Sequence, residues 1–335
     1  MQGLKIFALS ESRELAEKIA AGLGVKLGEH IERDFEDGEH KARILENVRN
    51  QDVYVVQSLQ ADPGRSVNDK LCRLLFFLGS IKDAGAANVT AVTPYLCYMR
   101  KDRKTKPRDP VTTRYIAGLF EAVGTDRILT VDVHNLQAYQ NAFRCRDEHL
   151  EAKNVFADYF LDELGEKNLA VMSPDAGGVK RADAFREVLE ERLETEVPLI
   201  FMEKKRSMGE VSGSAVVGEV EQKSVIIFDD MIASGGTMMR AAKACRERGA
   251  AKVYAAATHA AFISDANEAL AEEALDQVVV SNTITQTPLE AEAVVEKLKV
   301  LDVAPLFAEA IKRINEGGSI VELLGNRVVE RRNHK

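Results

Sequence analysis

Cysteine is scarce and scattered in this 335-residue chain, whose four cysteines include no Cys-x-x-Cys pair. A disulfide framework or a zinc site is therefore disfavoured, and reduced thiols are expected. No apolar run approaches the roughly 20 residues that span a bilayer. The N-terminus runs directly into a strand-like segment, without the basic and apolar regions of a signal peptide. These absences predict a soluble protein of the cytoplasm.

The chain also lacks an excess of positive charge, because 53 acidic residues outnumber 45 basic ones and give a net charge of −8. Nucleic acids and anionic membrane surfaces repel such a chain on average, so we expect neither as a partner. A local basic pocket for a small phosphorylated ligand remains compatible with this balance. The length exceeds that of a usual single domain and predicts two.

Short β-branched runs alternate with amphipathic helical patterns along nearly the whole chain. Apolar runs without strict alternation are typical of parallel strands that helices cover on both faces, so the predicted class is α/β. Strands are predicted at 5–9, 53–56, 89–92, 128–131, 169–172, 199–202, 225–228, 253–257 and 278–280. Helices are predicted at 15–23, 67–84 and 110–123, the last with Pro110 in its first turn.

A short internal similarity favours two similar domains. The segment 85–89 resembles 249–253, and each follows an amphipathic helix and precedes a strand. Such junctions are common in α/β folds, so the similarity alone does not decide the point. The charged stretch 144–150 is the expected boundary. We predict domains at 1–147 and 148–335, with C-terminal helices that can pack back on the first domain.

The most informative segment is 225–237 (VIIFDDMIASGGT), where an apolar strand ends in two carboxylates and a loop of small residues opens a helix. The backbone N–H groups of such a loop can converge on an anion, which the helix N-terminus also favours. The carboxylates can accept hydrogen bonds from vicinal sugar hydroxyls. An ordinary strand-to-helix turn is the simpler alternative. The residues predicted to bind a phosphorylated pentose are Asp229, Asp230, Ala233, Ser234, Gly235, Gly236 and Thr237.

This segment resembles the ribose-phosphate-binding loop of the type I phosphoribosyltransferase fold, which includes phosphoribosyltransferases and ribose-phosphate pyrophosphokinases. The chain has neither a P-loop nor a Gly-x-Gly-x-x-Gly after a strand. The pyrophosphokinase family is also resembled by 35–39 (FEDGE), 94–104 (PYLCYMRKDRK), 131–134 (VDVH), 173–178 (SPDAGG), 303–306 (VAPL) and 308–311 (AEAI). A simple phosphoribosyltransferase has one such domain and would lack these motifs. The resemblance therefore implies two similar phosphoribosyltransferase-like domains, each a mostly parallel sheet flanked by helices.

The resemblance also implies where ATP binds. Phe35 would stack on adenine while Asp37 and Glu39 contact the base, from a loop that a neighbouring subunit contributes. Arg100 would pair with the triphosphate, since guanidinium geometry suits bidentate phosphate contact. Taken alone, Arg100 is a charge in a solvated basic run, and Asp37-Gly38 is a turn. The ATP-binding residues implied by the family are Phe35, Asp37, Glu39, Arg100, Lys101 and Asp102.

Metal and catalytic roles likewise come from the resemblance. His134 and Asp175 would be ligands of the Mg²⁺ bound to ATP, although a lone His is more often structural and Asp175 also suits a turn. Lys204 and Arg206 would close over the triphosphate, before a Gly- and Ser-bearing stretch at 207–218 that is typical of a mobile loop. The implied reaction is attack of the C1 hydroxyl of ribose 5-phosphate on the β-phosphorus of Mg-ATP, giving 5-phosphoribosyl 1-diphosphate and AMP. The family forms dimers that assemble into hexamers.

The chain departs from the family pattern in several places. Lys101 replaces a common glutamine, Ala233 stands where many members have aspartate, Ser234-Gly235 replaces Thr-Ala, and 61–65 (ADPGR) is a small insertion. Allosteric control by phosphate or ADP is left open, because only Arg49 and Ser319 lie in matching regulatory regions. Two alternatives remain at this stage. One is a non-catalytic regulatory subunit, and the other is a phosphoribosyltransferase that consumes the diphosphate product.

Overall fold

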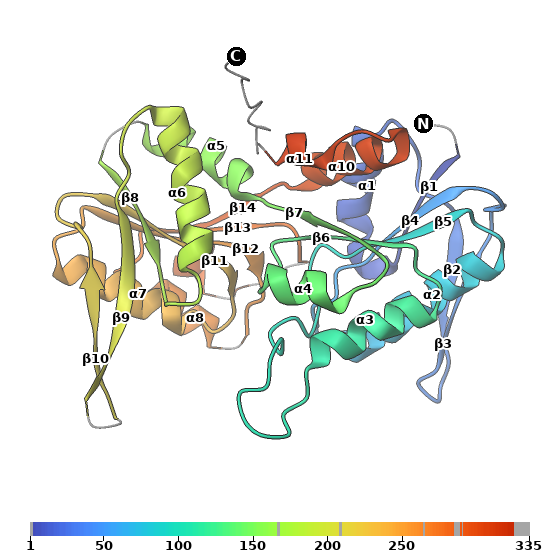
Figure 1. The fold of residues 1–335 in the computed structure, drawn as a ribbon, viewed down its shortest axis with the longest axis horizontal. Helices are drawn as coiled ribbons and strands as arrows, with labels where there is room; N and C mark the ends of the chain where they lie inside the picture. The colour runs from blue at the N-terminus through green and yellow to red at the C-terminus, as the bar shows by residue number, and fades with distance from the viewer. Residues whose placement is uncertain are drawn as a thin grey trace, which may run out of the picture. The chain divides into compact units, whose positions relative to one another are not determined.

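The computed structural model describes residues 3–165, 168–207, 210–263, 265–284, 289 and 291–324, and within 203–215 it describes the backbone only. The chain divides into two compact units (Figure 1). One comprises Met1–Glu151 together with the chain from Val303 onward, and the other is Ala152–Asp302. The boundary placed after residue 147 from the sequence falls inside a strand, Arg146–Leu150. The division therefore comes after Glu151, because that strand completes the sheet of the first unit.

The first unit is built on a five-stranded parallel sheet in the order β1-β4-β5-β6-β7, with a separate antiparallel pair, β2 and β3. Its strands are β1 (Leu4–Ala8), β2 (His30–Asp34), β3 (His40–Ile44), β4 (Asp52–Val56), β5 (Asn88–Val92), β6 (Arg127–Val131) and β7 (Arg146–Leu150). Its helical segments are η1 (Ser10–Ser12), α1 (Arg13–Gly22), α2 (Val67–Asp83), α3 (Thr112–Ala122), α4 (Leu136–Ala142), α10 (Ala304–Glu316) and α11 (Ile320–Leu323). The central strands are almost wholly buried, as expected for a parallel sheet under helices.

The C-terminal helix α10 is part of the first unit because it packs against α1. The two helices approach closely: a Cβ added at Gly22 would lie 3.0 Å from the Cβ of Ala308. Asn315 of α10 also donates a 2.9 Å hydrogen bond to Asp52 at the start of β4. The first unit is thus assembled from both ends of the described chain.

The second unit is built on a seven-stranded sheet in the order β10-β9-β8-β11-β12-β13-β14. All neighbouring strands are parallel except β9 and β10 at one edge. The strands are β8 (Leu169–Ser173), β9 (Leu199–Ser207), β10 (Glu210–Val217), β11 (Ser224–Ile232), β12 (Lys252–Ala260), β13 (Gln277–Ser281) and β14 (Leu298–Leu301). The helices are α5 (Lys153–Leu164), α6 (Val179–Leu193), α7 (Gly236–Glu247), α8 (Ala266–Ala271) and α9 (Glu292–Val295).

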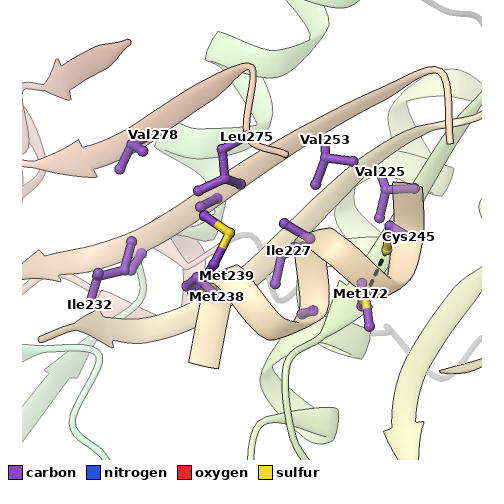
Figure 2. Packing of buried hydrophobic residues seen from close by; sticks show 14 of the residues in the cluster. Met172, Val225, Ile227, Ile232, Met238, Met239, Cys245, Val253, Leu275 and Val278 are labelled. Carbon is purple, nitrogen blue, oxygen red and sulfur yellow. Dashed lines mark hydrogen bonds between the residues drawn. The ribbon is translucent and has the colours of Figure 1, made fainter. Parts of the chain in front are cut away.

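The central strand β11 is covered on both faces, by α6 and by α7. Phe228 of β11 stacks on Phe185 of α6, with ring centroids 4.3 Å apart. The preceding residue, Ile227, belongs instead to a cluster with Met238 and Met239 of α7 (Figure 2). Successive side chains of a strand point to opposite faces, so α6 and α7 lie on opposite sides of the sheet. The strand that carries the carboxylate pair is therefore held in a fully packed core.

The structure confirms the α/β class and the predicted strands and helices, and it adds strands that the sequence analysis missed. The charged stretch expected to be a linker is β7, and the expected loop at 207–218 contains β10. The loop around Phe35 is the turn between β2 and β3. Pro110 was placed in the first turn of a helix, but α3 begins two residues later, with Val111 at its N-cap. None of the described helices is long and apolar enough to cross a membrane.

Candidate functional site

The carboxylate pair lies near the end of β11 and is bridged by an arginine from α6. Nη1 of Arg181 donates hydrogen bonds of 2.6 Å to Asp229 and 3.0 Å to Asp230. The backbone N–H of Asp230 also donates to the Asp229 carboxylate, at 2.9 Å. Side-chain exposure is 18% for Asp229 and only 3% for Asp230. Two acids that share one cation in a half-buried site form a compact acceptor for polar hydrogens.

This environment changes the ionisation of Asp229. Burial raises the pKa of its carboxyl to about 7, and the like charge of Asp230 adds to the effect. The guanidinium of Arg181 opposes both influences. The carboxyl therefore titrates near neutral pH, a behaviour that is concentrated at functional sites.

The small-residue loop continues from β11 into α7. Gly235 is the N-cap of α7 and adopts a left-handed conformation, with φ 75°. No side chain caps the helix, so the N–H groups of its first turn are available to an anion. Arg240, one turn into α7, donates from Nη2 to the hydroxyl of Thr237 at 3.2 Å. The segment thus places backbone N–H groups, a hydroxyl and a cation at one helix end, next to the carboxylate pair in sequence.

Asp175 lies in the turn between β8 and α6. Its Oδ1 accepts hydrogen bonds from the backbone N–H groups of Gly177, at 2.8 Å, and Gly178, at 3.1 Å. A Cβ at Gly178 would lie only 3.3 Å from Oδ1 of Asp229, so the absence of a side chain lets this turn lie against the carboxylate pair. The structure therefore brings Asp175 to the same end of the second unit's sheet as Asp229.

The predicted nucleotide stretch follows β5 in the first unit. The hydroxyl of Thr113 donates to the carbonyl oxygens of Tyr98, at 3.3 Å, and Lys101, at 3.2 Å, which ties the stretch to α3. The side chains of Arg100 and Lys101 are exposed, while Asp102 is half-buried. Two cations are therefore presented to solvent from an anchored backbone.

His134 is exposed in the segment between β6 and α4, and its neighbours on both sides are fixed. The N–H of Val133 donates to Nε2 of His149 at 3.1 Å. Asn135 caps α4 by accepting from the N–H of Ala138 at 3.2 Å, and it donates from Nδ2 to the carboxylate of Asp102. The Asn135–Asp102 bond brings the nucleotide stretch and the His134 segment together within the first unit.

Phe35, Asp37 and Glu39 lie at the exposed tip of the β2–β3 hairpin. The N–H of Phe35 donates to the carbonyl of Glu39 at 2.9 Å, and Oδ1 of Asp37 accepts from the N–H of Glu39 at 3.1 Å. Gly38 adopts φ 88°, which only glycine adopts readily. Phe35 is 38% exposed, and the guanidinium of Arg33 lies 5.1 Å from the centroid of its ring. An exposed aromatic ring on an ordered turn is a surface on which a planar ligand can stack.

Lys204 and Arg206 lie within β9, but their side chains are outside the described part of the chain. In the backbone register, Lys204 faces Ser214 and Arg206 faces Val211. The register shifts between Val211 and Ser214, an irregularity of the kind that bends a strand locally. The predicted catalytic pair thus spans an irregular segment of an antiparallel edge.

The residues fit a Mg²⁺ ion that arrives with substrate phosphates better than an all-protein metal cage. Within the described ranges, no group of three or more His, Cys, Asp or Glu side chains could hold a metal ion. The second carboxylate oxygen of Asp175 has no partner among the described residues, and a carboxylate is a preferred ligand of Mg²⁺. His134 is exposed, but it belongs to the other unit. Mg²⁺ commonly uses one or two protein ligands together with phosphates and water, which these residues permit.

Comparison with known proteins identifies the family. Residues 4–124 match the N-terminal domain of ribose phosphate pyrophosphokinase, and residues 192–325 match the phosphoribosyl synthetase-associated domain. The chain is 41% identical over 322 residues to a ribose-phosphate pyrophosphokinase of Caldanaerobacter subterraneus, covering 96% of this chain and 97% of that one. It is 39% identical over 321 residues to ribose-phosphate pyrophosphokinase 1 of Listeria monocytogenes, covering 96% of each. The chain belongs to the ribose-phosphate pyrophosphokinase family.

A solved member of this family has the same fold. The phosphoribosylpyrophosphate synthetase of Mycobacterium smegmatis superposes with a TM-score of 0.84 at 35% identity, covering 95% of this chain and 100% of that one. The family assigned from the sequence motifs is therefore confirmed, as is the phosphoribosyltransferase-like fold. The chain is an enzyme of the family, a diphosphotransferase, and the alternative of a non-catalytic regulatory subunit is disfavoured by the names of these relatives.

Three residues of the site were not predicted from the sequence. Arg181 bridges Asp229 and Asp230, Asn135 binds Asp102, and Arg240 reaches Thr237. Arg181 and Asn135 lie far along the chain from their partners, so no local pattern marks them. Arg240 could have been found, because a residue one turn into a helix can direct its side chain back toward the helix start.

We expect Gly235→Ala to destabilise the second unit. The new Cβ would lie 3.0 Å from the Cβ of Ala269, and a left-handed backbone disfavours any L-residue. The combined loss should be about 1–3 kcal/mol of unfolding free energy, measured by thermal melting. Gly317→Ala is the matched control, since Gly317 has φ 74° with nothing within 4 Å of the added Cβ. Equal losses in the two variants would contradict the packing argument.

Proposed function

We propose that the enzyme binds Mg-ATP through elements of its first unit and ribose 5-phosphate through the 229–237 segment of its second unit. It then transfers the diphosphoryl group to the C1 hydroxyl and releases AMP. The observation that carries the assignment of the sugar site is the Arg181-bridged carboxylate pair beside an uncapped glycine-rich helix start. Carboxylates suit vicinal hydroxyls, and the uncapped helix start suits the 5-phosphate.

On the sugar side, the chain positions its acceptor substrate with groups of opposite character. The backbone N–H groups of Gly236 and Thr237, with the Thr237 hydroxyl, would hold the 5-phosphate. Asp229 and Asp230 would accept hydrogen bonds from the ribose hydroxyls, and Arg181 keeps the two like charges together. Fixing both ends of the sugar restricts the direction in which its C1 hydroxyl can approach, and such positioning accounts for much of the catalysis of phosphoryl-type transfer.

On the nucleotide side, we assign binding of adenine to Phe35, Asp37 and Glu39 and binding of the triphosphate to Arg100, with Lys101 and Asp102 beside it. Lys204 and Arg206 are the cations proposed to neutralise charge that builds on the phosphoryl oxygens. Asp175 and His134 would hold the Mg²⁺ that accompanies ATP, which supplies further charge neutralisation when bound.

The direct test is an assay of the purified protein with Mg-ATP and ribose 5-phosphate, which follows AMP and phosphoribosyl diphosphate together. A parallel sample contains inorganic phosphate. Equal amounts of the two products are the expected result. If neither product forms with or without phosphate while ATP still binds, the catalytic proposal fails. Pyrophosphate release that depends on an added base would instead indicate a phosphoribosyltransferase.

The raised pKa of Asp229 predicts a pH dependence. Because this carboxyl is protonated below its pKa of about 7, kcat/KM for ribose 5-phosphate should fall about tenfold per pH unit as the pH drops below that value. Asp229→Asn should remove this limb and retain only a decline near pH 6, which comes from the phosphate of the substrate, whose pKa is about 6. A wild-type profile that is flat down to pH 6 would contradict the prediction.

The raised pKa of Asp229 also makes the stability of the fold depend on pH, in the direction opposite to that of most acids. The folded carboxyl binds its proton more tightly than the unfolded one, whose pKa is about 3.9. The contribution of Asp229 to stability therefore increases as the pH falls from about 7 toward 4.

We further propose that subunits associate, since the family arrangement has the Phe35 hairpin serve the active site of a neighbouring subunit. Light scattering coupled to size exclusion would show dimers or hexamers, and a monomer at micromolar concentration would contradict the proposal. A cytoplasmic location remains a prediction.

A further inference from the structure

The hairpin that carries Phe35 is a weak structural element by itself. β2 and β3 form a sheet of two strands whose residues are all half-buried or exposed. Such an isolated hairpin is marginally stable in water unless something packs against it. Near its base, the ring of His30 packs on Phe77 of α2, with centroids 5.0 Å apart. At the end next to the tip, the ring of His40 stacks on Phe76 of α2, with centroids 5.5 Å apart, and Asp34, the last residue of β2, makes the polar contacts.

The insertion at 61–65 supplies one of those contacts from a rigid turn. Asp62 and Arg65 exchange backbone hydrogen bonds of 3.0 and 3.3 Å. The carboxylate of Asp62 accepts from the N–H groups of Gly64, at 2.8 Å, and Arg65, at 2.9 Å. Asp62 is also paired with the buried Lys70 of α2 at 2.5 Å. The backbone of Arg65 is therefore held in place independently of the contacts that its side chain makes.

The next residue fixes the turn on its other side. Ser66 is the N-cap of α2 and forms a capping box with Asp69: its N–H donates to the Asp69 carboxylate at 2.9 Å, and its hydroxyl accepts from the Asp69 N–H at 3.2 Å. The turn is thus continuous with a helix that is anchored in the core of the first unit.

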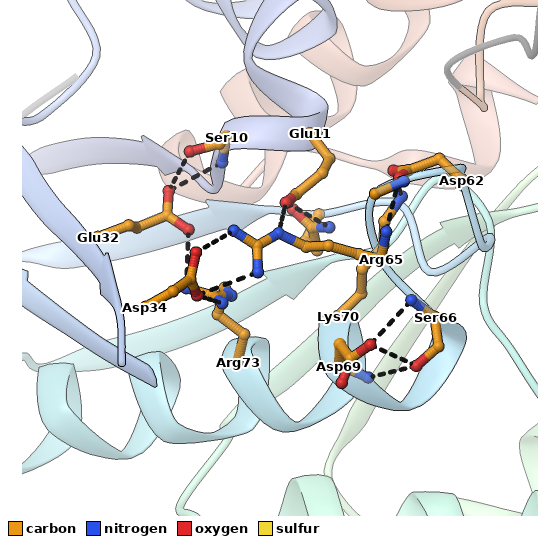
Figure 3. Close-up of polar contacts among 12 residues, drawn as sticks. Ser10, Glu11, Glu32, Asp34, Asp62, Arg65, Ser66, Asp69, Lys70 and Arg73 are labelled. Atoms are coloured by element: carbon orange, nitrogen blue, oxygen red, sulfur yellow. Dashed lines mark hydrogen bonds and ion pairs between the residues drawn. The ribbon is translucent and has the colours of Figure 1, made fainter. Parts of the chain in front are cut away.

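From this turn the guanidinium of Arg65 reaches the hairpin (Figure 3). It forms a bidentate pair with Asp34, with Nη1 to Oδ1 at 3.2 Å and Nη2 to Oδ2 at 2.9 Å, and its Nε contacts Glu11. Arg73 of α2, 2% exposed, contacts the same carboxylate of Asp34. The two guanidinium groups hold the pKa of Asp34 well below its ordinary value, so the carboxylate stays ionised at neutral pH.

The space around these contacts is not filled by apolar side chains. A pocket of about 570 Å³ lies between the insertion turn and the hairpin, and its lining includes Asp34, Gly38, His40, Asp62 and Arg65. Removal of the guanidinium would leave the carboxylate of Asp34 with Arg73 alone, and no apolar side chain of this pocket would replace the lost pair. A tip that is held less firmly must be ordered in part by the ligand, and that ordering reduces affinity.

We propose that Arg65 is a positioning residue for the nucleotide site: the insertion turn holds Asp34 and thereby keeps Phe35, Asp37 and Glu39 in the conformation that receives adenine. The inference rests on the proposed role of the hairpin in binding ATP. Arg65 itself need not touch the nucleotide, because its effect passes through the residue that precedes Phe35. The insertion would thus set nucleotide affinity and leave the sugar site unchanged.

Steady-state kinetics of the full-length enzyme test this role. Arg65→Ala should raise KM for ATP about tenfold, while kcat and KM for ribose 5-phosphate stay within about twofold. The KM for ATP of Arg65→Lys should lie between those of the wild type and Arg65→Ala, since an ammonium cannot reproduce the bidentate pair. When Arg65→Ala is combined with Asp34→Ala, their effects on KM for ATP should be strongly non-additive, because both changes remove the same interaction. Arg13→Ala is the control, as Arg13 forms only an exposed pair with Glu17 among the described contacts.

A Phe35→Ala variant separates failure of the inference from failure of the proposed function. If Phe35→Ala raises KM for ATP and Arg65→Ala does not, the positioning role is wrong while the hairpin still binds ATP. If Phe35→Ala also leaves KM for ATP unchanged, the proposed role of the hairpin fails and the inference falls with it. If Arg65→Ala changes both KM values and the melting temperature together, Arg65 is a general stabilising residue, which overturns the inference as well.

Discussion

Lys204→Ala is expected to lower kcat by about 1,000-fold, the scale of loss when a cation that stabilises transferred phosphoryl charge is removed. Charge builds on the phosphoryl oxygens as the bond to AMP breaks, and a fixed cation stabilises that state more than the bound substrate. KM for ATP should therefore change much less than kcat. Product formation is measured by AMP release at saturating concentrations of both substrates.

Lys243→Ala provides the control for this experiment. Lys243 lies on α7 and forms an exposed pair with Glu272, so its removal should leave kcat within about twofold of the wild type. A Lys204→Ala enzyme that retains more than a tenth of the wild-type kcat would show that the charge is neutralised elsewhere. Arg206→Ala would then be the next variant to measure.

Replacing both site acids, as Asp229→Asn/Asp230→Asn, should lower kcat/KM for ribose 5-phosphate by at least about 100-fold, since each charge-assisted hydrogen bond contributes about 1.5–3 kcal/mol. The shape of both side chains is retained, so the loss reports on charge and not on a cavity. Arg181 would also lose both of its anionic partners in the pair, and a half-buried cation without them is unfavourable. KM for ATP should change little.

A sugar analogue makes the interpretation of this variant sharper. With 2-deoxyribose 5-phosphate, the wild-type enzyme should lose most of its catalytic efficiency, while the double variant should lose little more than it already has. Asp183→Asn is the control, because that carboxylate forms a partly exposed pair with Arg186 on α6. If the double variant discriminates between ribose and deoxyribose as well as the wild type does, the carboxylates do not bind the hydroxyls.

The strands that could be predicted from the sequence are those buried by helices. The apolar run of β5 gives its bounds to within one residue, and that of β11 gives its start, although β11 continues to Ile232, beyond the predicted end at 228. β7 has the sequence Arg-Asp-Glu-His-Leu and lies at the sheet edge, where charged side chains are tolerated and even favoured. The hairpin strands β2 and β3 are likewise polar, because neither face is fully covered. Composition alone cannot distinguish such strands from loops.

The residues of the site also differ in how far their roles could be predicted, depending on whether their partners lie near them in the sequence. The segment from Asp229 to Thr237 is continuous in sequence, so its chemistry could be predicted together with its order. Arg181 is 48 residues from Asp229, and only the packing of α6 on β11 brings them into contact. Arg65 was noted only as part of an insertion, and its contact with Asp34 spans 31 residues. Contacts of this kind depend on tertiary structure, which no motif encodes.

The return of α10 to α1 has a consequence for how the enzyme is made. A ribosome must synthesise the chain through α10, which ends at Glu316, before α1 can meet its packing partner. The second unit is continuous from Ala152 to Asp302, so its sheet can be completed before α10 of the first unit has been synthesised. Domains usually finish folding in the order of synthesis, N-terminal first. Here the second unit is complete in sequence before the first, and a nascent chain that stops before α10 would leave α1 without the helix that packs against it.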